Sequence, residues 1–298
     1  MEPTSRITSH LLQSDADVQT LRDLLRHPDG KTVVDFEERI QIEQVRAATR
    51  IWQADGTPIA FAFVDDFSNL NFVSDPAHAT PALESEIVDW GLALVRARNA
   101  ETGETSTLDA SCQAGNLGRL AFLERHGFQR EEVRSLGYRR PLDLPIAEHP
   151  LPAGFSLRPA RGEEEVEDLV ALHRSAFGTD HMTVEYRLAM MRAPQYVPEL
   201  DLLAVAPGGE LAAFCICGFE EGRPEIGFTD PIGVREGYKG RGLGAAVVTA
   251  GLNALQARGA KVAQLGTSSQ NLAMRRLAEH LGFELVSETF WFSKPVED

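Results

Sequence analysis

Cysteine and positive charge are both scarce in this 298-residue chain. Its three cysteines, Cys112, Cys215 and Cys217, are too few and too odd in number for a disulfide framework. Cys215 and Cys217 alternate in AAFCICGF, a pattern that suits small buried thiols better than metal ligands. No apolar run approaches the roughly 20 residues of a membrane-spanning helix, and the first residues lack the features of a signal peptide. We therefore expect a cytoplasmic protein with no membrane contact and no metal site.

A basic excess is missing from both halves of the chain. The net charge is −15, of which residues 1–150 contribute −9 and residues 151–298 contribute −6. Nucleic-acid binding depends on clustered positive charge, so we expect no nucleic-acid partner. An acidic surface mildly favours a cationic substrate, but acidity is also a common route to solubility.

The length of the chain favours two domains, because 298 residues exceed the size at which one core is comfortable. Residues 141–154, PLDLPIAEHPLPAG, hold four prolines and end in glycine. Proline at this density disfavours helix and central strand, and therefore predicts a linker. We predict a first domain over 1–145, a linker over 146–154 and a second domain over 155–298.

The two halves share sequence landmarks at one constant offset. NLGRLAFLERHGF (116–128) and NLAMRRLAEHLGF (271–283) both open on asparagine and close on Gly-Phe, 155 residues apart. VSDP (73–76) and FTDP (228–231) repeat at the same offset. Matching order and spacing indicate an internal duplication in which each half forms one domain.

The second half alternates strand and helix patterns. Helices are predicted at 163–177, 183–191, 241–259 and 271–283, and strands at 155–159, 200–205, 210–219, 225–234, 261–267 and 287–294. This order is typical of the α/β class. We therefore predict two tandem α/β domains, each with a mixed central sheet flanked by helices.

A glycine-rich stretch, YKGRGLGAA (238–246), falls between a predicted strand and a predicted helix. Free N–H groups at a helix start attract anions. Bare backbone at three glycines allows a ligand to approach closely, and two cations add positive charge; these residues are Gly240, Gly242, Gly244, Lys239 and Arg241. The stretch predicts a pyrophosphate cradle, with an ordinary glycine-rich turn as the alternative.

The spacing Gly240-x-Gly242-x-x-Ala245 also satisfies the dinucleotide fingerprint. That fingerprint requires a tight turn directly after the strand and an acidic residue about 20 positions later. Here REGYK separates Val234 from the first glycine, and the next strand, KVAQLGT, contains no acid. Both conditions fail, which argues against dinucleotide binding.

The segment VREGYKGRGLG (234–244) resembles the cofactor loop of the GNAT superfamily of acyl-CoA-dependent N-acyltransferases, and residues 271–283 resemble that family's second cofactor motif. The resemblance covers most of 155–298, and the whole chain is similar to tandem two-domain members. It implies an N-acetyltransferase that uses acetyl-CoA, acts on a primary amine of a small molecule or peptide, and is a monomer or homodimer. Lys239 stands where the family usually has Arg or Gln. Ala278 stands where many members place a tyrosine that acts as general acid.

The resemblance also assigns roles to individual residues. It implies that Asp230 takes the proton of the amine and that the N–H of Val234 stabilises the oxyanion. Tyr186 and Tyr196 lie in the segment that lines the acceptor side, where each could contact substrate or pack. The implied cofactor-binding residues are Val234, Lys239, Gly240, Arg241, Gly242, Leu243, Gly244, Ala245 and Asn271.

The first half acts as an internal control for these roles. After Asp75-Pro76 it continues AHATPALESEIVDW (77–90), which contains no glycine and no Lys or Arg, so we expect this domain to lack the cofactor loop. Asn116 matches Asn271, which favours a helix N-cap role for both. Asp75 matches Asp230, which leaves a structural Asp beside a strand bulge as an alternative to the general base. The missing tyrosine and the altered first half motivate another function, a non-catalytic acyl-CoA-binding sensor or interaction protein.

Overall fold

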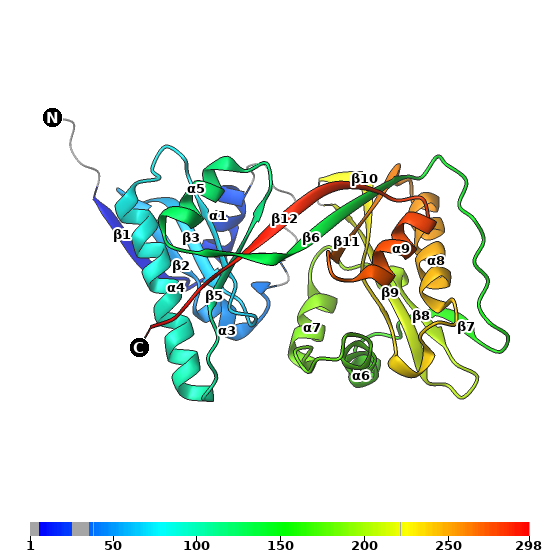
Figure 1. Ribbon diagram of the computed structural model, residues 1–298. Helices are drawn as coiled ribbons and strands as arrows, with labels where there is room; N and C mark the ends of the chain where they lie inside the picture. The colour runs from blue at the N-terminus through cyan, green and yellow to red at the C-terminus, as the bar shows by residue number, and fades with distance from the viewer. Residues whose placement is uncertain (1–5, 26–35, 38, 221, 298) are drawn as a thin grey trace. The chain divides into compact units, whose positions relative to one another are not determined.

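The computed structural model describes residues 6–25, 36–37, 39–220 and 222–297. The chain divides into two compact units (Figure 1). Unit 1 comprises Met1–Arg134 and Thr289–Asp298, and unit 2 comprises Ser135–Glu288. None of the helices within the described ranges is long and apolar enough to cross a membrane.

The units differ from the consecutive halves that the proline-rich stretch suggests, and the reason is strand pairing. The last strand, β12 (Glu284–Lys294), pairs through Thr289–Lys294 with β5 (Leu108–Gln113), which lies in unit 1. The second half of β6 (Gln129–Pro141) instead pairs with β11 (Val262–Ser268) in unit 2. Residues 146–154 therefore lie inside unit 2.

Unit 1 contains an antiparallel sheet in the order β1-β2-β3-β4. Its core gathers around Trp52, which is fully buried and meets the ring of Trp90 edge to face. The other strands and the helices of the unit are β1 (Ile7–Leu11), α1 (Asp15–Leu25), α3 (Glu43–Ala47), β2 (Arg50–Ala54), β3 (Thr57–Val64), β4 (Leu70–Ser74), α4 (Pro81–Thr102) and α5 (Leu117–Arg125).

Unit 2 is built on a mixed sheet in the order β7-β8-β9-β10-β11-β6-β12. β10 and β11 run parallel, whereas β7, β8, β9 and β10 are joined by antiparallel pairs. Its remaining elements are β7 (Ser156–Pro159), η1 (Glu163–Glu165), α6 (Val166–Phe177), α7 (Val184–Arg192), η2 (Pro198–Leu200), β8 (Asp201–Val205), β9 (Leu211–Glu220), β10 (Arg223–Val234), η3 (Glu236–Tyr238), α8 (Leu243–Ala257) and α9 (Leu272–His280).

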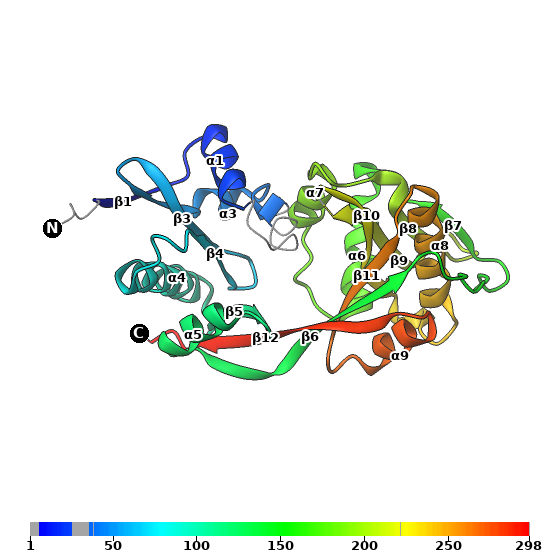
Figure 2. The same cartoon turned by 90° about the horizontal axis from the view of Figure 1, so that it is seen from above.

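Helices cover both faces of the unit 2 sheet (Figure 1 and Figure 2). The side chains of β9 divide between two cores, as the alternation of a strand requires. Cys215 and Cys217 belong to the core with α8 and α9, and Phe214 and Ile216 belong to the core with α6 and α7. The predicted class, two tandem α/β domains, is confirmed.

The paired asparagines of the two halves act as helix N-caps in both units. The Asn116 side chain accepts a hydrogen bond from the Arg119 N–H at 3.0 Å, at the start of α5. The Asn271 side chain accepts from the Met274 N–H at 3.1 Å, at the start of α9. The recurrence of this residue therefore reflects the need of each helix for a capped first turn.

Candidate active site

The strands β10 and β11 separate at the centre of unit 2. Their parallel ladder covers Ile226–Phe228 and Val262–Gln264, although β10 continues to Val234 and β11 to Ser268. The Thr229 hydroxyl donates to the Gln264 carbonyl at 3.3 Å where the ladder ends. The two strands thus open a fork toward their carboxyl ends, which is where parallel strands in α/β sheets commonly present ligand sites.

A β-bulge lies at the start of this fork. Thr229 pairs with Cys217 and Ile232 with Cys215, so three steps along β10 match two steps along β9. Asp230 is one of the extra residues, and its side chain is exposed. A bulge re-aims side chains and is common beside active sites. The bulge and a catalytic role of Asp230 are therefore compatible with each other.

The backbone of Val234 faces the open side of the fork. Val234 is in register with Ala213 of β9, and the next residue, Arg235, donates its N–H to the Ala212 carbonyl at 2.8 Å. Successive residues of a strand direct their N–H groups to opposite edges. The Val234 N–H therefore points away from β9, toward the edge that β11 has left.

The glycine-rich loop leads from the fork into α8. Gly242 is the residue that caps this helix, with φ of +80°, and it has no side chain that could accept from the first N–H groups. The first helical hydrogen bond is donated by the Ala246 N–H to the Gly242 carbonyl. The N–H groups of Leu243, Gly244 and Ala245 consequently have no partner within the helix. This helix start has the geometry that binds phosphate groups.

The cations of the loop are exposed and already engaged. The Lys239 ammonium forms an ion pair with Glu236. Arg241 donates to the Gly237 carbonyl at 3.3 Å, and its guanidinium lies over the Tyr238 ring, 5.2 Å from the centroid. Arg241 thus adds positive charge next to the uncapped helix start, whereas the charge of Lys239 is offset by its neighbour.

Ala278 points into the core of unit 2. The residue is fully buried, among the side chains that pack α8 and α9 against the sheet. No hydroxyl group is therefore available at this position to protonate a leaving group.

The two candidate acceptor-side tyrosines have different surroundings. Tyr186, in the first turn of α7, packs partly buried against the core of α6 and α7. The Tyr196 hydroxyl donates to Asp201 Oδ2 at 2.6 Å. Burial, with the Asp201 carboxylate beside it, raises the pKa of Tyr196 above its usual range. Because this hydroxyl is already bonded to Asp201, a packing role is favoured for Tyr196.

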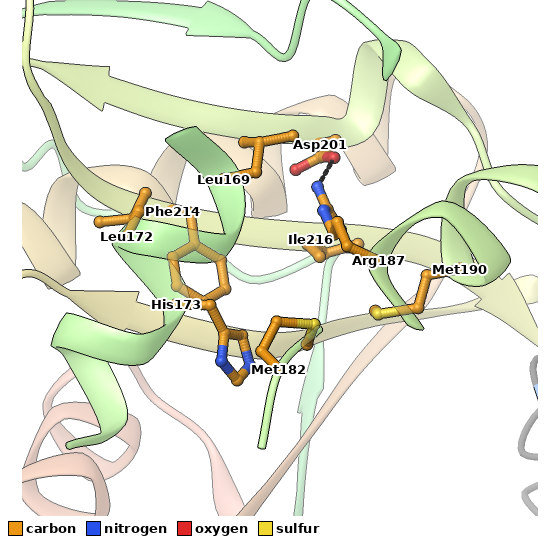
Figure 3. Close-up of a pocket in the computed structure, with 9 residues that line it drawn as sticks. All are labelled: Leu169, Leu172, His173, Met182, Arg187, Met190, Asp201, Phe214 and Ile216. Atoms are coloured by element: carbon orange, nitrogen blue, oxygen red, sulfur yellow. Dashed lines mark hydrogen bonds and ion pairs between the residues drawn. The ribbon is translucent and has the colours of Figure 1, made fainter. Parts of the chain in front are cut away.

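Asp201 also lines a pocket between α6, α7 and the strands β8 and β9, shown in Figure 3. Its carboxylate forms a buried ion pair with Arg187, drawn as a dashed line in the figure. Arg187 Nη1, Asp201 Oδ1 and His173 Nδ1 have no hydrogen-bond partner within the described residues. Burial, with Arg187 nearby, lowers the pKa of His173 to about 4, so this imidazole is neutral at pH 7. The lining contains no residue of the fork or of the glycine-rich loop.

In unit 1, side-chain hydrogen bonds already occupy the groups that match the start of α8 and Asp230. The matching helix, α4, is capped by Thr80, whose hydroxyl accepts from the Leu83 N–H at 3.3 Å, and Pro81 removes a further donor. Asp75 turns back into its own loop, where it accepts from the Ala77 N–H at 2.9 Å and contacts His78 at 3.0 Å. These contacts leave α4 without the uncapped start that α8 presents.

The chain is similar to known proteins in sequence and in structure. Residues 166–283 match the model of the acetyltransferase (GNAT) family. The chain is similar to a mycothiol acetyltransferase of Salinispora arenicola, with 30% identity over 90% of this chain and 89% of that protein. A mycothiol acetyltransferase of Kineococcus radiotolerans is 37% identical over 45% of this chain and 44% of its own length.

Solved structures support the same fold. A GCN5-related N-acetyltransferase from Sphaerobacter thermophilus aligns with a TM-score of 0.71 and 20% identity, over 99% of this chain and 97% of its own. A tandem GNAT protein from the clavulanic acid biosynthesis pathway aligns with a TM-score of 0.70 and 16% identity, over 98% and 99%. The family match and the relatives above show that the chain belongs to the GNAT family of acetyltransferases. It is therefore an acyltransferase with a tandem architecture.

The sequence patterns did not indicate a role for two residues at the fork. Thr229 bridges the strands where they part, and Gly266 lies directly beneath Asp230, because a Cβ on Gly266 would be 2.8 Å from Asp230 Oδ2. A glycine inside a predicted strand is a signal of close approach by another group, and it could have drawn attention to Gly266.

Proposed function

We propose that the chain transfers an acetyl group from acetyl-CoA to a primary amine of a small molecule or peptide, and that unit 2 carries the activity. One observation carries the proposal. The fork between β10 and β11 opens beside the uncapped N-terminus of α8, so a phosphate site and a free strand edge adjoin. Unit 1, with its capped helix α4, is proposed to lack the cofactor site.

The residues of the loop fit the pyrophosphate of acetyl-CoA. Backbone N–H groups of residues 240–245 would hold the phosphates, because the Lys239 N–H already donates to the Glu236 carbonyl at 3.3 Å. Arg241 would reduce the phosphate charge, and Lys239 would add to this on release from its ion pair with Glu236. The open edge of β10 at Val234 would pair with the amide-bearing arm of the cofactor, and the exposed Asn271 lies at the start of α9, where its amide can add a contact. When bound, acetyl-CoA supplies the activated acyl group.

Two residues of β10 would then act on the reacting atoms. Asp230 accepts a proton from the amine, whose nitrogen forms a bond to the acyl carbon while the carbon–sulfur bond breaks. The electron pair of that bond leaves with the sulfur. The Val234 N–H stabilises the negative charge that develops on the acyl oxygen, which is often a large contribution to catalysis.

Proton delivery to the sulfur is assigned to water. Ala278 is buried and has no acidic group. A thiol with a pKa of about 8.5 is a fair leaving group without a dedicated acid. The same observation favours the second candidate, an acyl-CoA-binding sensor that performs no turnover.

The acceptor is proposed to be an amine of a small molecule. The support comes from the relatives named for mycothiol, four of which align over about nine-tenths of this chain. Tyr186 is the candidate acceptor contact from α7, and Tyr196 is proposed to support that segment through its bond to Asp201. Deacetylated mycothiol therefore heads the panel of amines to be tried, followed by a lysine-containing peptide and 2-phenylethylamine.

Calorimetric titration with acetyl-CoA, with CoA and NAD as comparators, tests the proposal, followed by a CoA-release assay over the amine panel. We expect one acetyl-CoA site per chain and release of CoA with at least one amine. Two sites would contradict the proposal for unit 1. Binding without turnover of any amine would favour the sensor. Failure to bind any CoA species, or a preference for NAD, would overturn the assignment of the loop.

A further inference from the structure

Two glycines face each other beside the fork of unit 2. Gly266 of β11 is the direct partner of Gly137 of β6 in the antiparallel ladder. Directly opposed residues of an antiparallel pair present their Cβ positions to the same face, about 5 Å apart. This part of the sheet therefore has a strip of bare backbone two strands wide.

A polar side chain from each flanking strand lies over this strip. A Cβ on Gly266 would be 2.8 Å from Asp230 Oδ2, and a Cβ on Gly137 would be 2.2 Å from Ser287 Oγ. Both distances are shorter than real Cβ contacts, so a side chain at either glycine would displace its neighbour. The carboxylate from β10 and the hydroxyl from β12 thus depend on the two glycines for their positions.

Both polar groups lie on the face of the sheet opposite α8 and α9. Leu265, the neighbour of Gly266, packs in the core with those helices, so Gly266 faces the other way. Asp230 and Ser287 are both exposed. A carboxylate over one glycine and a hydroxyl over the next can be reached together by one small group, because the two positions are about 5 Å apart.

We propose that Ser287 is a second contact for the acceptor amine beside Asp230, and that Gly137 and Gly266 are positioning residues for this pair. The inference rests on the proposed function of unit 2. A hydroxyl oxygen has two acceptor lone pairs. Ser287 Oγ accepts one N–H of the amine, and Asp230 removes another proton. The nitrogen lone pair is then directed at the acyl carbon, and the leaving thiolate takes its proton from water.

Unit 1 provides a natural comparison for this arrangement. The residue 155 positions before Gly266 is Ser111, and its partner in the ladder of β5 and β12 is Trp291. Side chains fill both positions there, and Asp75 is bonded within its own turn. The bare strip is thus a feature of unit 2, which is the unit with the uncapped helix α8.

Steady-state kinetics with the panel amine that the wild-type chain turns over fastest tests the proposal. We expect Ser287→Ala to raise the KM for the amine roughly tenfold to a hundredfold, the range for a hydrogen bond to a charged group. The KM for acetyl-CoA and the pH profile of kcat should stay unchanged, and Ser287→Thr, which keeps the hydroxyl, should recover much of the loss. Ser156→Ala, an exposed serine on β7, is the matched control.

A double-mutant cycle with Gly137→Ala separates positioning from general damage to the sheet. If Gly137 acts through Ser287, then Gly137→Ala should raise the KM for the amine in the wild type but add little in the Ser287→Ala background. Gly208→Ala, at a glycine with open space around it, controls for the substitution itself. An unchanged KM in Ser287→Ala, or fully additive effects in the cycle, would overturn the proposal. Absence of turnover in the wild type would instead contradict the proposed function.

Discussion

The guanidinium of Arg187 on α7 and the carboxylate of Asp201 at the start of β8 form an ion pair that is almost closed to water, with exposed side-chain fractions of 4% and 0%. Tyr196 donates a further hydrogen bond to the same carboxylate. Asp201 thereby ties both α7 and the segment that follows it to the start of β8. A charge in this position depends on its partner, because burying an ion without compensation is costly.

We expect Arg187→Met to lower the free energy of unfolding by about 3–5 kcal/mol, because Asp201 would remain buried without its partner. Urea denaturation followed by circular dichroism measures the change. Arg192→Met on the same helix is the control, since its pair with Glu163 is more than half exposed on both sides and its loss should cost far less stability. Equal losses in the two variants would contradict this account of the buried pair.

The neutral state of His173 predicts a pH-dependent stability. Its folded pKa of about 4 lies below the ordinary value of 6.5, so the unfolded chain takes up a proton first as the pH falls. Stability from this group is complete above about pH 6.5 and decreases as the pH falls toward 4. His173→Gln should reduce the loss of stability between pH 7.5 and 5, measured as the shift in urea midpoint. A loss in His173→Gln as large as that in the wild type would contradict this role of the imidazole.

Bulky substitutions in the glycine-rich loop should abolish acetyl-CoA binding while the fold is kept. Gly242→Val places a branched side chain at φ of +80° on the start of α8, so the N–H groups would no longer face a phosphate. Gly244→Val should act through crowding, because a Cβ there already lies 3.4 Å from Leu277 and 3.6 Å from Val234. Calorimetry should detect no acetyl-CoA binding in either variant. Unchanged affinity beside the Gly208→Ala control would exclude this loop as the phosphate site.

The duplication supplies a control for the proposed general base. Asp230→Asn should lower kcat by roughly 10²- to 10⁴-fold, the usual contribution of proton transfer to a positioned side chain. The affinity for acetyl-CoA should not change, because Asp230 is not part of the loop. Asp75→Asn, at the matching place in unit 1, should leave kcat unaltered. A similar loss in both variants would favour the structural role for Asp230.

Local patterns in the sequence were sufficient for most elements of unit 2. The predicted helix at 241–259 forms over Leu243–Ala257, and the predicted strand at 225–234 forms over Arg223–Val234. Gly242 and Asn271 carry local signals, since a glycine with positive φ and an asparagine cap act on their own helices. The cofactor and catalytic roles of these and the neighbouring residues stay predictions.

Long-range pairing explains what the sequence did not reveal. The partners of β6 and β12 are set by contacts between residues more than a hundred positions apart, which no local periodicity records. The proline-rich stretch looked like a boundary because prolines exclude regular structure, but they equally suit an irregular segment within a unit. Gly266 lay in a predicted strand and Gly137 in a stretch with no prediction, because the role of each depends on Asp230 or Ser287 from a neighbouring strand.

The route of β6 has a practical consequence for anyone expressing the second half of the chain alone. A fragment that starts at residue 155, after the prolines, omits Ser135–Pro141 and so removes the strand that covers one edge of β11. The backbone donors and acceptors of β11 that this exposes would favour aggregation. The omitted strand also brings Gly137, half of the strip beneath the proposed amine contacts. The fragment that starts at residue 155 would therefore have a weakened site for the proposed amine contacts and would be less soluble. A fragment that begins at Ser135 keeps both the covering strand and Gly137.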